Sequence, residues 1–300
     1  MRTSKSSPRH AELDSVSPCF QKIADHVRND ERAINGVFRS PLMIRAIFFD
    51  IDGTLVSFNT QKMLQSTKTA VIKLRQKGIK VFIATGRTVG EMNNLDDLEF
   101  DGYITANGAY CVDSQGKVID SHRISTASLE RLACDLDRNP FPCVFVTEKG
   151  NFINYADEMM IHIRQIVNLP IPPVMPVNEI IKHEIFQLDA YMDAARENEL
   201  LAHVLPDCMA CRWHPYFADI NPKRCSKATG MEQFLAYFGI EREHTMAFGD
   251  GGNDISMIKH AAIGVAMGNA QDEVKAAADY VTDSVEADGI VKALRYFELL

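Results

Sequence analysis

The chain has 300 residues, of which 46% are hydrophobic and 24% are charged, and its formal net charge is −8. This composition excludes a mostly disordered chain, and no apolar run reaches the length of a membrane-spanning helix. The acidic balance provides no general basic surface for nucleic acid, so we expect neither a nucleic-acid nor a membrane partner.

The N-terminal residues 1–42 are rich in Ser, Arg and Pro and show no signal-peptide pattern. We assign them to an extension outside the fold, either disordered or preceding a true start at Met43, with one marginal helix over 20–29. The seven cysteines are odd in number and scattered, which is typical of reduced thiols in a cytoplasm. Cys208 and Cys211 have CxxC spacing, but no second such pair exists, so a strand is favoured over a metal or redox site.

The apolar run from Ile44 to Phe49 predicts a buried strand, and Asp50-Ile51-Asp52-Gly53-Thr54-Leu55 follows where it ends. An ordinary Asp-Gly turn with solvated acids would explain this hexapeptide taken alone. The alternative is that these acids take part in catalysis. Two carboxylates just beyond a strand end can both face a crevice, Asp50 as a nucleophile and Asp52 as a proton carrier.

The chain then alternates helices and strands, which predicts a parallel sheet. A helix over 60–77 separates the first strand from a second over 81–84. Thr85-Gly86-Arg87 follows this second strand and offers a hydroxyl and backbone N–H groups to an anion. The same pattern of strands resumes near the C-terminus, so we expect the two ends of the chain to form one sheet. The further predicted strands cover 103–105, 245–248, 263–267 and 280–282.

The middle of the chain has a different pattern, in which predicted strands follow one another directly, for example at 144–147 and 152–155. Neighbouring strands of this kind predict antiparallel pairing in an α+β unit. We therefore predict that residues 125–215 form a domain inserted into a core of residues 43–124 and 216–300.

Two further loops add charged groups. Ser226-Lys227 precedes a predicted helix over 228–238, so Lys227 either directs its ammonium group at the crevice or is an ordinary surface lysine. Gly249-Asp250-Gly251-Gly252-Asn253-Asp254 follows the strand at 245–248, and its glycines let the backbone approach a ligand. If these loops converge, four carboxylates face one lysine and need a cation. Oxygen ligands select a hard ion, so we predict Mg²⁺ at Asp50, Asp52, Asp250 and Asp254.

A carboxylate nucleophile, a lysine, a hydroxyl and a metal ion are the parts of a phosphoryl-transfer site. Asp50 would attack phosphorus and form an aspartyl phosphate, which water then hydrolyses. Asp52 would protonate the leaving oxygen and later accept a proton from water. Thr85 and Lys227 would hold the phosphoryl oxygens.

In order and spacing, these four loops resemble the four motifs of the haloacid dehalogenase superfamily, and most closely its Cof-like, type IIB branch. The match covers about 44–300. Further segments support it: Ala106-Asn107-Gly108-Ala109, Val265-Ala266-Met267-Gly268-Asn269-Ala270, Ala278-Asp279-Tyr280-Val281-Thr282 and Asp288-Gly289-Ile290.

The resemblance implies a Rossmann-like α/β core with an inserted α/β cap, and hydrolysis of phosphate monoesters. It implies Mg²⁺ bound by Asp50, the backbone carbonyl of Asp52 and Asp250, with Asp254 supporting the metal. It also implies a set of phosphate contacts, from the Ile51 backbone, Thr85, Gly86, Lys227 and Asn253.

Related enzymes act on sugar phosphates and other small phosphorylated metabolites, so we expect a substrate of this kind, with specificity set by the cap. Four polar residues on predicted cap strands are candidates for either a substrate contact or a structural role: Asp189, Tyr191, Arg212 and His214. A phosphomutase on the same core and a receiver-type phosphoacceptor domain are the alternatives. The sequence leaves the oligomeric state open.

Overall fold

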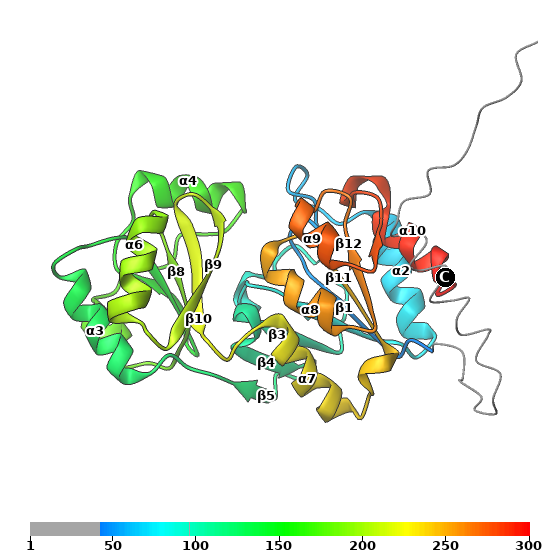
Figure 1. Cartoon of the computed structure of the whole chain (residues 1–300), viewed down its shortest axis with the longest axis horizontal. Coiled ribbons are helices and arrows are strands. Elements are labelled where there is room, and N and C mark those ends of the chain that lie inside the picture. Colours follow the sequence, from blue (N-terminus) through cyan, green and yellow to red (C-terminus); the bar gives the residue numbers. More distant parts are fainter. Residues whose placement is uncertain (1–42, 96) are drawn as a thin grey trace, which may run out of the picture. The chain divides into compact units, whose positions relative to one another are not determined.

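Two sheets organise the structure, one of eight strands and one of five. The computed structural model describes residues 43–95 and 97–300. The predictions made for residues 1–42 lie outside these described residues. We call the eight-stranded sheet with its helices the core, and the five-stranded sheet with its helices the cap; Figure 1 labels helices and strands of each.

The core sheet has the strand order β13-β12-β11-β1-β2-β3-β4-β5. Neighbours from β13 to β3 are parallel, whereas β4 pairs antiparallel with β3 and β5 pairs antiparallel with β4. The strand bounds are β1 (Ala46–Phe49), β2 (Lys80–Ala84), β3 (Gly102–Thr105), β4 (Tyr110–Asp113), β5 (Val118–Ser121), β11 (Thr245–Gly249), β12 (Ile263–Ala266) and β13 (Tyr280–Val281).

Helices cover both faces of the core sheet because successive strand side chains point to opposite sides. On β1, Phe49 packs in one buried cluster with Leu74 of α2 and Leu294 of α10, while Phe48 packs in another with Phe234 of α7. The core helices are α2 (Gln65–Gln76), α7 (Lys227–Phe238), α8 (Ile255–His260), α9 (Asp272–Ala277) and α10 (Gly289–Tyr296). Short 3₁₀ turns are η1 (Val89–Glu91), η2 (Ala106–Gly108), η4 (Arg242–His244), η5 (Gly252–Asp254) and η6 (Val285–Ala287).

The cap sheet has the order β7-β6-β8-β10-β9, and its neighbours pair antiparallel. Its strands are β6 (Cys143–Thr147), β7 (Gly150–Ile153), β8 (Ile185–Ala190), β9 (Cys208–His214) and β10 (Phe217–Pro222). Its helices are α3 (Thr126–Leu136), α4 (Glu158–Ile166), α5 (Val177–Ile180), α6 (Ala194–Glu199) and the π-helical η3 (Leu200–Val204). Leu132, Phe145 and Leu188 belong to the buried apolar cluster that joins α3 to this sheet.

The predicted fold class is confirmed: a mostly parallel α/β core carries an inserted α/β cap. Three details of the prediction are wrong. Strand β10 pairs with β8 and β9, so the chain returns to the core after Pro222 and not at residue 216. The core also contains the antiparallel strands β4 and β5, which were not predicted, and α2 begins at Gln65 instead of 60.

Cys208 and Cys211 both lie on strand β9, as the favoured interpretation predicted, and both are free thiols. Within the described ranges, none of the helices combines the length and the apolar character needed to cross a membrane.

Candidate active site

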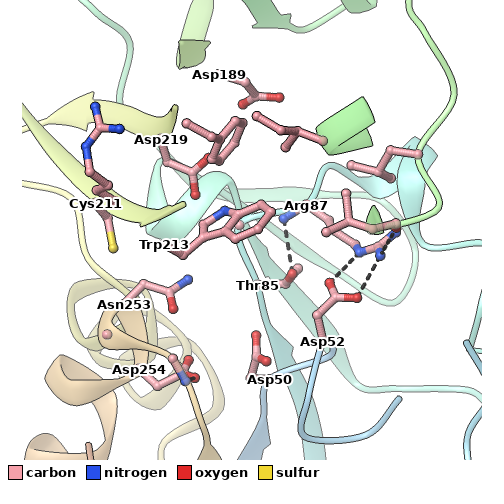
Figure 2. A pocket seen from close by; sticks show the side chains of 18 of the residues that line it. Asp50, Asp52, Thr85, Arg87, Asp189, Cys211, Trp213, Asp219, Asn253 and Asp254 are labelled. Atoms are coloured by element: carbon pink, nitrogen blue, oxygen red, sulfur yellow. Dashed lines mark hydrogen bonds and ion pairs between the residues drawn. The ribbon is translucent and has the colours of Figure 1, made fainter. Parts of the chain in front are cut away.

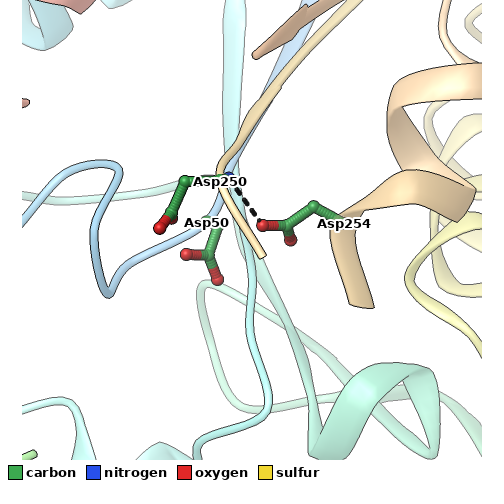
Figure 3. A group of neighbouring side chains, drawn as sticks. All are labelled: Asp50, Asp250 and Asp254. Carbon is green, nitrogen blue, oxygen red and sulfur yellow. Dashed lines mark hydrogen bonds between the residues drawn. The ribbon is translucent and has the colours of Figure 1, made fainter. Parts of the chain in front are cut away.

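The loops that follow β1 and β11 meet because these two strands are paired in parallel at the centre of the core sheet. Phe49 is in register with Phe248, and the backbone N–H of Asp50 donates to the Phe248 carbonyl at 3.0 Å. The next residues along each strand are therefore brought together. Figure 3 shows Asp50, Asp250 and Asp254 side by side at this point.

Three carboxylates form a compact group. One oxygen each of Asp50, Asp250 and Asp254 lies within 4.8 Å of the others, a spacing at which the three could share a metal ion. Asp254 is held from two sides: one oxygen accepts the backbone N–H groups of Asp250 and Gly251, each at 2.9 Å, and the other accepts Lys227 Nζ at 2.5 Å. Asp254 therefore fixes both the glycine-rich loop and the lysine.

Lys227 is fully buried between two of these acids. Its Nζ donates to Asp50 at 2.6 Å as well as to Asp254. Ser226 caps helix α7 by accepting the Thr229 N–H, and this cap places Lys227 on the first turn, facing the strand ends. Burial lowers the pKa of Lys227, but Asp254 and Asp50 raise it by more, so the net pKa lies above its usual value. The surface-lysine alternative is excluded by this burial.

The electrostatics of the group favour an added cation. Burial, followed by repulsion from Asp254, raises the pKa of Asp50 well above its usual range. The same two causes raise the pKa of Asp250 to about 7. Three clustered acids share one lysine, so the negative charge is undercompensated, and all the ligand atoms are oxygens. A hard divalent cation such as Mg²⁺ fits this donor set.

Asp52 stands apart from the three-acid group and is paired with Arg87. Arg87 Nε and Nη2 donate to the two Asp52 oxygens at 2.6 and 2.7 Å, a two-point contact that fixes the carboxyl plane (Figure 2). Arg87 also donates to the backbone carbonyls of Glu91, at 3.0 Å, and of Val167 in the cap, at 2.9 Å. From the sequence, four carboxylates were expected to face one lysine, and Arg87 had no predicted role of its own.

Three of the remaining predicted phosphate contacts, Thr85, Gly86 and Asn253, line one cavity. Thr85 is buried, and its Oγ1 accepts the Arg87 N–H at 3.1 Å. Asn253 Nδ2 donates to Asn107 Oδ1 at 2.9 Å. Gly86 lines the cavity as well, whereas the side chain of Ile51 is buried in the core, which leaves only its backbone for a ligand.

A cavity of about 350 Å³ opens above these groups, with the core as its floor and cap residues as its roof. Trp213 and Phe217 give the roof an aromatic face, and Figure 2 shows the Trp213 ring reaching over the space between Asp50 and Asp219. Of the four candidate cap residues, Asp189, Tyr191 and Arg212 line the cavity and His214 does not. Arg212 is engaged with Glu197 at 2.6 Å and with backbone carbonyls, which indicates a structural role.

A buried polar cluster that the sequence analysis did not identify joins core and cap. Asn107 Nδ2 lies 3.0 Å from Asp219 and 3.1 Å from Gln187, and Gln187 Nε2 donates to the Gly86 carbonyl at 3.1 Å. Asn107 adopts the left-handed conformation, with φ of 53°, which turns its side chain toward the cap. Burial, with Asp189 nearby, raises the pKa of Asp219 well above its usual range. The segment 106–109 was noted in the sequence only as part of the resemblance.

Comparisons with known proteins agree with this geometry. The model of the haloacid dehalogenase-like hydrolase family matches residues 47–294. The 5-amino-6-(5-phospho-D-ribitylamino)uracil phosphatase YcsE of Bacillus subtilis is 32% identical over 267 residues, which span 88% of this chain and 99% of that protein.

Among solved structures, the subclass IIB sugar phosphatase BT4131 is 42% identical with a TM-score of 0.80, over 85% of this chain and all of that one. The phosphatase BT1666 from Bacteroides thetaiotaomicron is 39% identical with a TM-score of 0.81, over 89% of this chain and all of that one.

Proposed function

Because the chain belongs to the haloacid dehalogenase-like hydrolases and is a phosphatase, we propose that it hydrolyses sugar phosphates or similar small phosphate esters with Mg²⁺, through an aspartyl phosphate on Asp50. The observation that carries this proposal is the buried Asp50, held by Lys227 at 2.6 Å within a three-acid group at the floor of the cavity.

Two displacements at phosphorus account for the reaction. A carboxylate oxygen of Asp50 bonds to phosphorus as the bond to the leaving oxygen breaks, and Asp52 gives that oxygen its proton. Water then attacks the aspartyl phosphate and passes a proton to Asp52, which releases inorganic phosphate and restores the Asp50 carboxylate. Lys227, the Thr85 hydroxyl and the neighbouring backbone would hold the phosphoryl oxygens while their charge shifts.

Asp50, Asp250 and the backbone carbonyl of Asp52 would hold Mg²⁺, with Asp254 fixing the loop behind them. When bound, the ion supplies positive charge that offsets the three clustered acids and the phosphate. Its fit rests on the oxygen-only donor set and on the pKa values of Asp50 and Asp250, which are raised first by burial and then by the neighbouring Asp254 carboxylate.

The cavity lining supports a leaving group that is polar but without negative charge. Trp213 and Phe217 offer flat apolar faces, while Asp189, Asp219 and Gln187 offer hydrogen-bonding groups, a combination suited to a sugar. The cations that line the cavity are already engaged: Arg87 with Asp52, Arg164 with Glu91 and Asp189, and Arg212 with Glu197. A second phosphate or a carboxylate on the substrate would therefore meet no spare positive group among the described residues that line the cavity.

A substrate panel tests this proposal. We expect Mg²⁺-dependent release of inorganic phosphate from hexose and pentose phosphates and from p-nitrophenyl phosphate, lower activity on sugar bisphosphates, and none after chelation. Formation of an isomeric sugar phosphate would instead identify a phosphomutase. Failure to release phosphate from every panel member, with Mg²⁺ present, would contradict the proposal, and a stable phosphoprotein would point to the receiver-type alternative.

A matched pair of glycine substitutions tests the metal site. Gly53 (φ 85°) and Gly78 (φ 80°) have nearly the same left-handed backbone, but a Cβ on Gly53 would lie 2.2 Å from Asp250 Oδ2, whereas a Cβ on Gly78 meets no atom within 4 Å. Gly53→Ala must therefore displace Asp250. We expect it to raise the Mg²⁺ concentration for half-maximal activity by about tenfold or more.

Gly78→Ala is the control for backbone strain. It should lower the free energy of unfolding by about 1–2 kcal/mol and leave Mg²⁺ activation unchanged. Equal Mg²⁺ activation in both variants would show that Asp250 does not bind the ion.

We also propose that the protein acts in the cytoplasm. The support is the distribution of its cysteines, of which the six on the described part of the chain are free thiols, four of them buried.

A further inference from the structure

A chain of buried charges runs from Asp52 at the active site into the cap. Arg87 donates two hydrogen bonds to the Asp52 carboxylate and one to the Glu91 backbone carbonyl. The Glu91 carboxylate receives Arg164 Nη2, from cap helix α4, at 2.9 Å. Arg164 continues to Asp189 on cap strand β8 at 3.5 Å. Side chains of alternating charge therefore lead from the proton carrier to the cap, and the Glu91 backbone carbonyl is the link between Arg87 and Glu91.

The three central residues of this series of charges are buried and hydrogen-bonded, unlike an incidental surface contact. Arg87, Glu91 and Arg164 are 6%, 7% and 1% exposed. The second Glu91 oxygen accepts the backbone N–H and the hydroxyl of Thr88, which fixes the η1 turn. Arg164 Nε donates to the Pro170 carbonyl at 2.7 Å. Because these three charges are buried, removing Arg164 leaves the Glu91 carboxylate without its counter-charge, which favours a shift of the η1 turn and of the Glu91 carbonyl that holds Arg87.

We propose that the cap residue Arg164 is a positioning residue for acid–base catalysis, acting through Glu91 and Arg87 to hold the Asp52 carboxyl toward the leaving oxygen. Proton transfer at Asp52 then depends on the cap being seated on the core at the Glu91–Arg164 contact. This inference rests on the proposed function, in which Asp52 carries the proton.

The two displacements make different demands on Asp52. A sugar alkoxide is a poor leaving group and needs a proton as the phosphorus–oxygen bond breaks, whereas nitrophenolate leaves without one. In the second displacement, water must lose a proton whichever substrate was used. A misplaced Asp52 therefore slows the first step for sugar phosphates alone and the second step for every substrate.

The experiment compares kcat/KM, which reports the first displacement, with kcat, on glucose 6-phosphate and p-nitrophenyl phosphate. For Arg164→Met we expect kcat/KM on glucose 6-phosphate to fall at least about tenfold, and that on p-nitrophenyl phosphate to stay within about threefold. The kcat on p-nitrophenyl phosphate should fall, with a burst of nitrophenol as the phosphoenzyme accumulates. Arg164→Lys should recover part of the loss.

Two controls separate a positioning role from a general structural one. Arg196→Met removes another cap arginine whose acidic partner, Asp135, lies within the cap, and it should leave all four kinetic constants unchanged. Glu91→Gln should reproduce the Arg164→Met pattern, and the double variant should be no worse than either single one, because both act on the same contact. If Arg164→Met does not fold, as judged by its thermal transition, the same comparison of kcat/KM and kcat on the two substrates is made with Glu91→Gln and Arg164→Lys.

Equal loss of kcat/KM on both substrates would show that Arg164 only supports the structure, and unchanged constants would show that it is not linked to Asp52. Either result overturns the inference. Asp52→Asn distinguishes this failure from failure of the proposed function. If Asp52→Asn gives the leaving-group pattern and Arg164→Met does not, only the inference is wrong; if Asp52→Asn does not give it, the role proposed for Asp52 is wrong.

Discussion

Asp50→Asn is expected to lower phosphatase turnover by roughly 10³-fold or more, because it removes the attacking oxygen while keeping the side-chain volume. The phosphoenzyme should disappear with the activity. Quenched reactions of the wild-type protein should contain an acid-stable, hydroxylamine-sensitive phosphoryl group, and those of the variant should contain none.

The variant is expected to stay folded. Burial and the charge of Asp254 raise the pKa of Asp50 in the folded protein, so the ionised Asp50 carboxylate lowers the free energy of unfolding at neutral pH. A neutral amide at this position carries no such electrostatic cost. Without metal, the Tm of Asp50→Asn should therefore lie at most a few degrees below that of the wild type.

Asp113→Asn is the matched control for this substitution. Asp113 is also buried at the end of a core strand, β4, where it accepts the backbone N–H groups of Gln115 and Lys117. Its substitution should leave kcat within about twofold, because it lies outside the cavity lining. Wild-type turnover in Asp50→Asn would assign the nucleophile to another residue.

Lys227→Met is expected to damage both catalysis and stability. Its ammonium group is the shared partner of Asp50 and Asp254, and no part of the side chain is exposed. Loss of a buried positive charge at the phosphoryl group should lower kcat by roughly 10²- to 10³-fold. Without metal, two buried carboxylates lose their counter-charge, so the free energy of unfolding should fall by about 3–5 kcal/mol.

Denaturant titrations with and without Mg²⁺ test the second effect. A bound cation replaces part of the missing positive charge, so Mg²⁺ should stabilise Lys227→Met more than it stabilises the wild type. Lys80→Met is the control: Lys80 forms an ion pair with Asp101 at the surface, 2.8 Å apart, and its loss should cost less than about 1 kcal/mol. A Lys227→Met variant with wild-type kcat would show that the ammonium group does not assist phosphoryl transfer.

Much of the core could be predicted because its strand ends are marked locally. Ile44 to Phe49 is a continuous apolar run that stops at two acids, and Thr245 to Phe248 stops at a glycine-rich loop. A parallel sheet brings such ends together without any knowledge of side-chain contacts. For this reason the sequence located Asp50, Asp250, Asp254 and Lys227 as one group.

Two ion pairs could not be predicted in this way. Arg87 and Asp52, both in the core, are 35 residues apart, and Glu91 of the core and Arg164 of the cap are 73 residues apart. No local pattern marks the partner, because the first pairing depends on how two core loops fold and the second on how the cap is placed. The hairpin of β4 and β5 is a different case, because the turn Asp113-Ser114-Gln115-Gly116 is a local signal for it that the prediction of a parallel sheet did not include.

The pairing of β1 with β11 also has a consequence for synthesis of the chain on the ribosome. Ala46 of β1 has Thr245 as its partner on one side, so that edge of β1 has no neighbour until most of the polypeptide has been made. At about 5–20 residues per second, this interval is on the order of 10–40 s. During this interval the nascent chain carries an exposed apolar strand edge, because its native partner β11 is translated late. Slow codons within the cap would lengthen that exposure, and we expect the yield of native enzyme to depend on translation speed there.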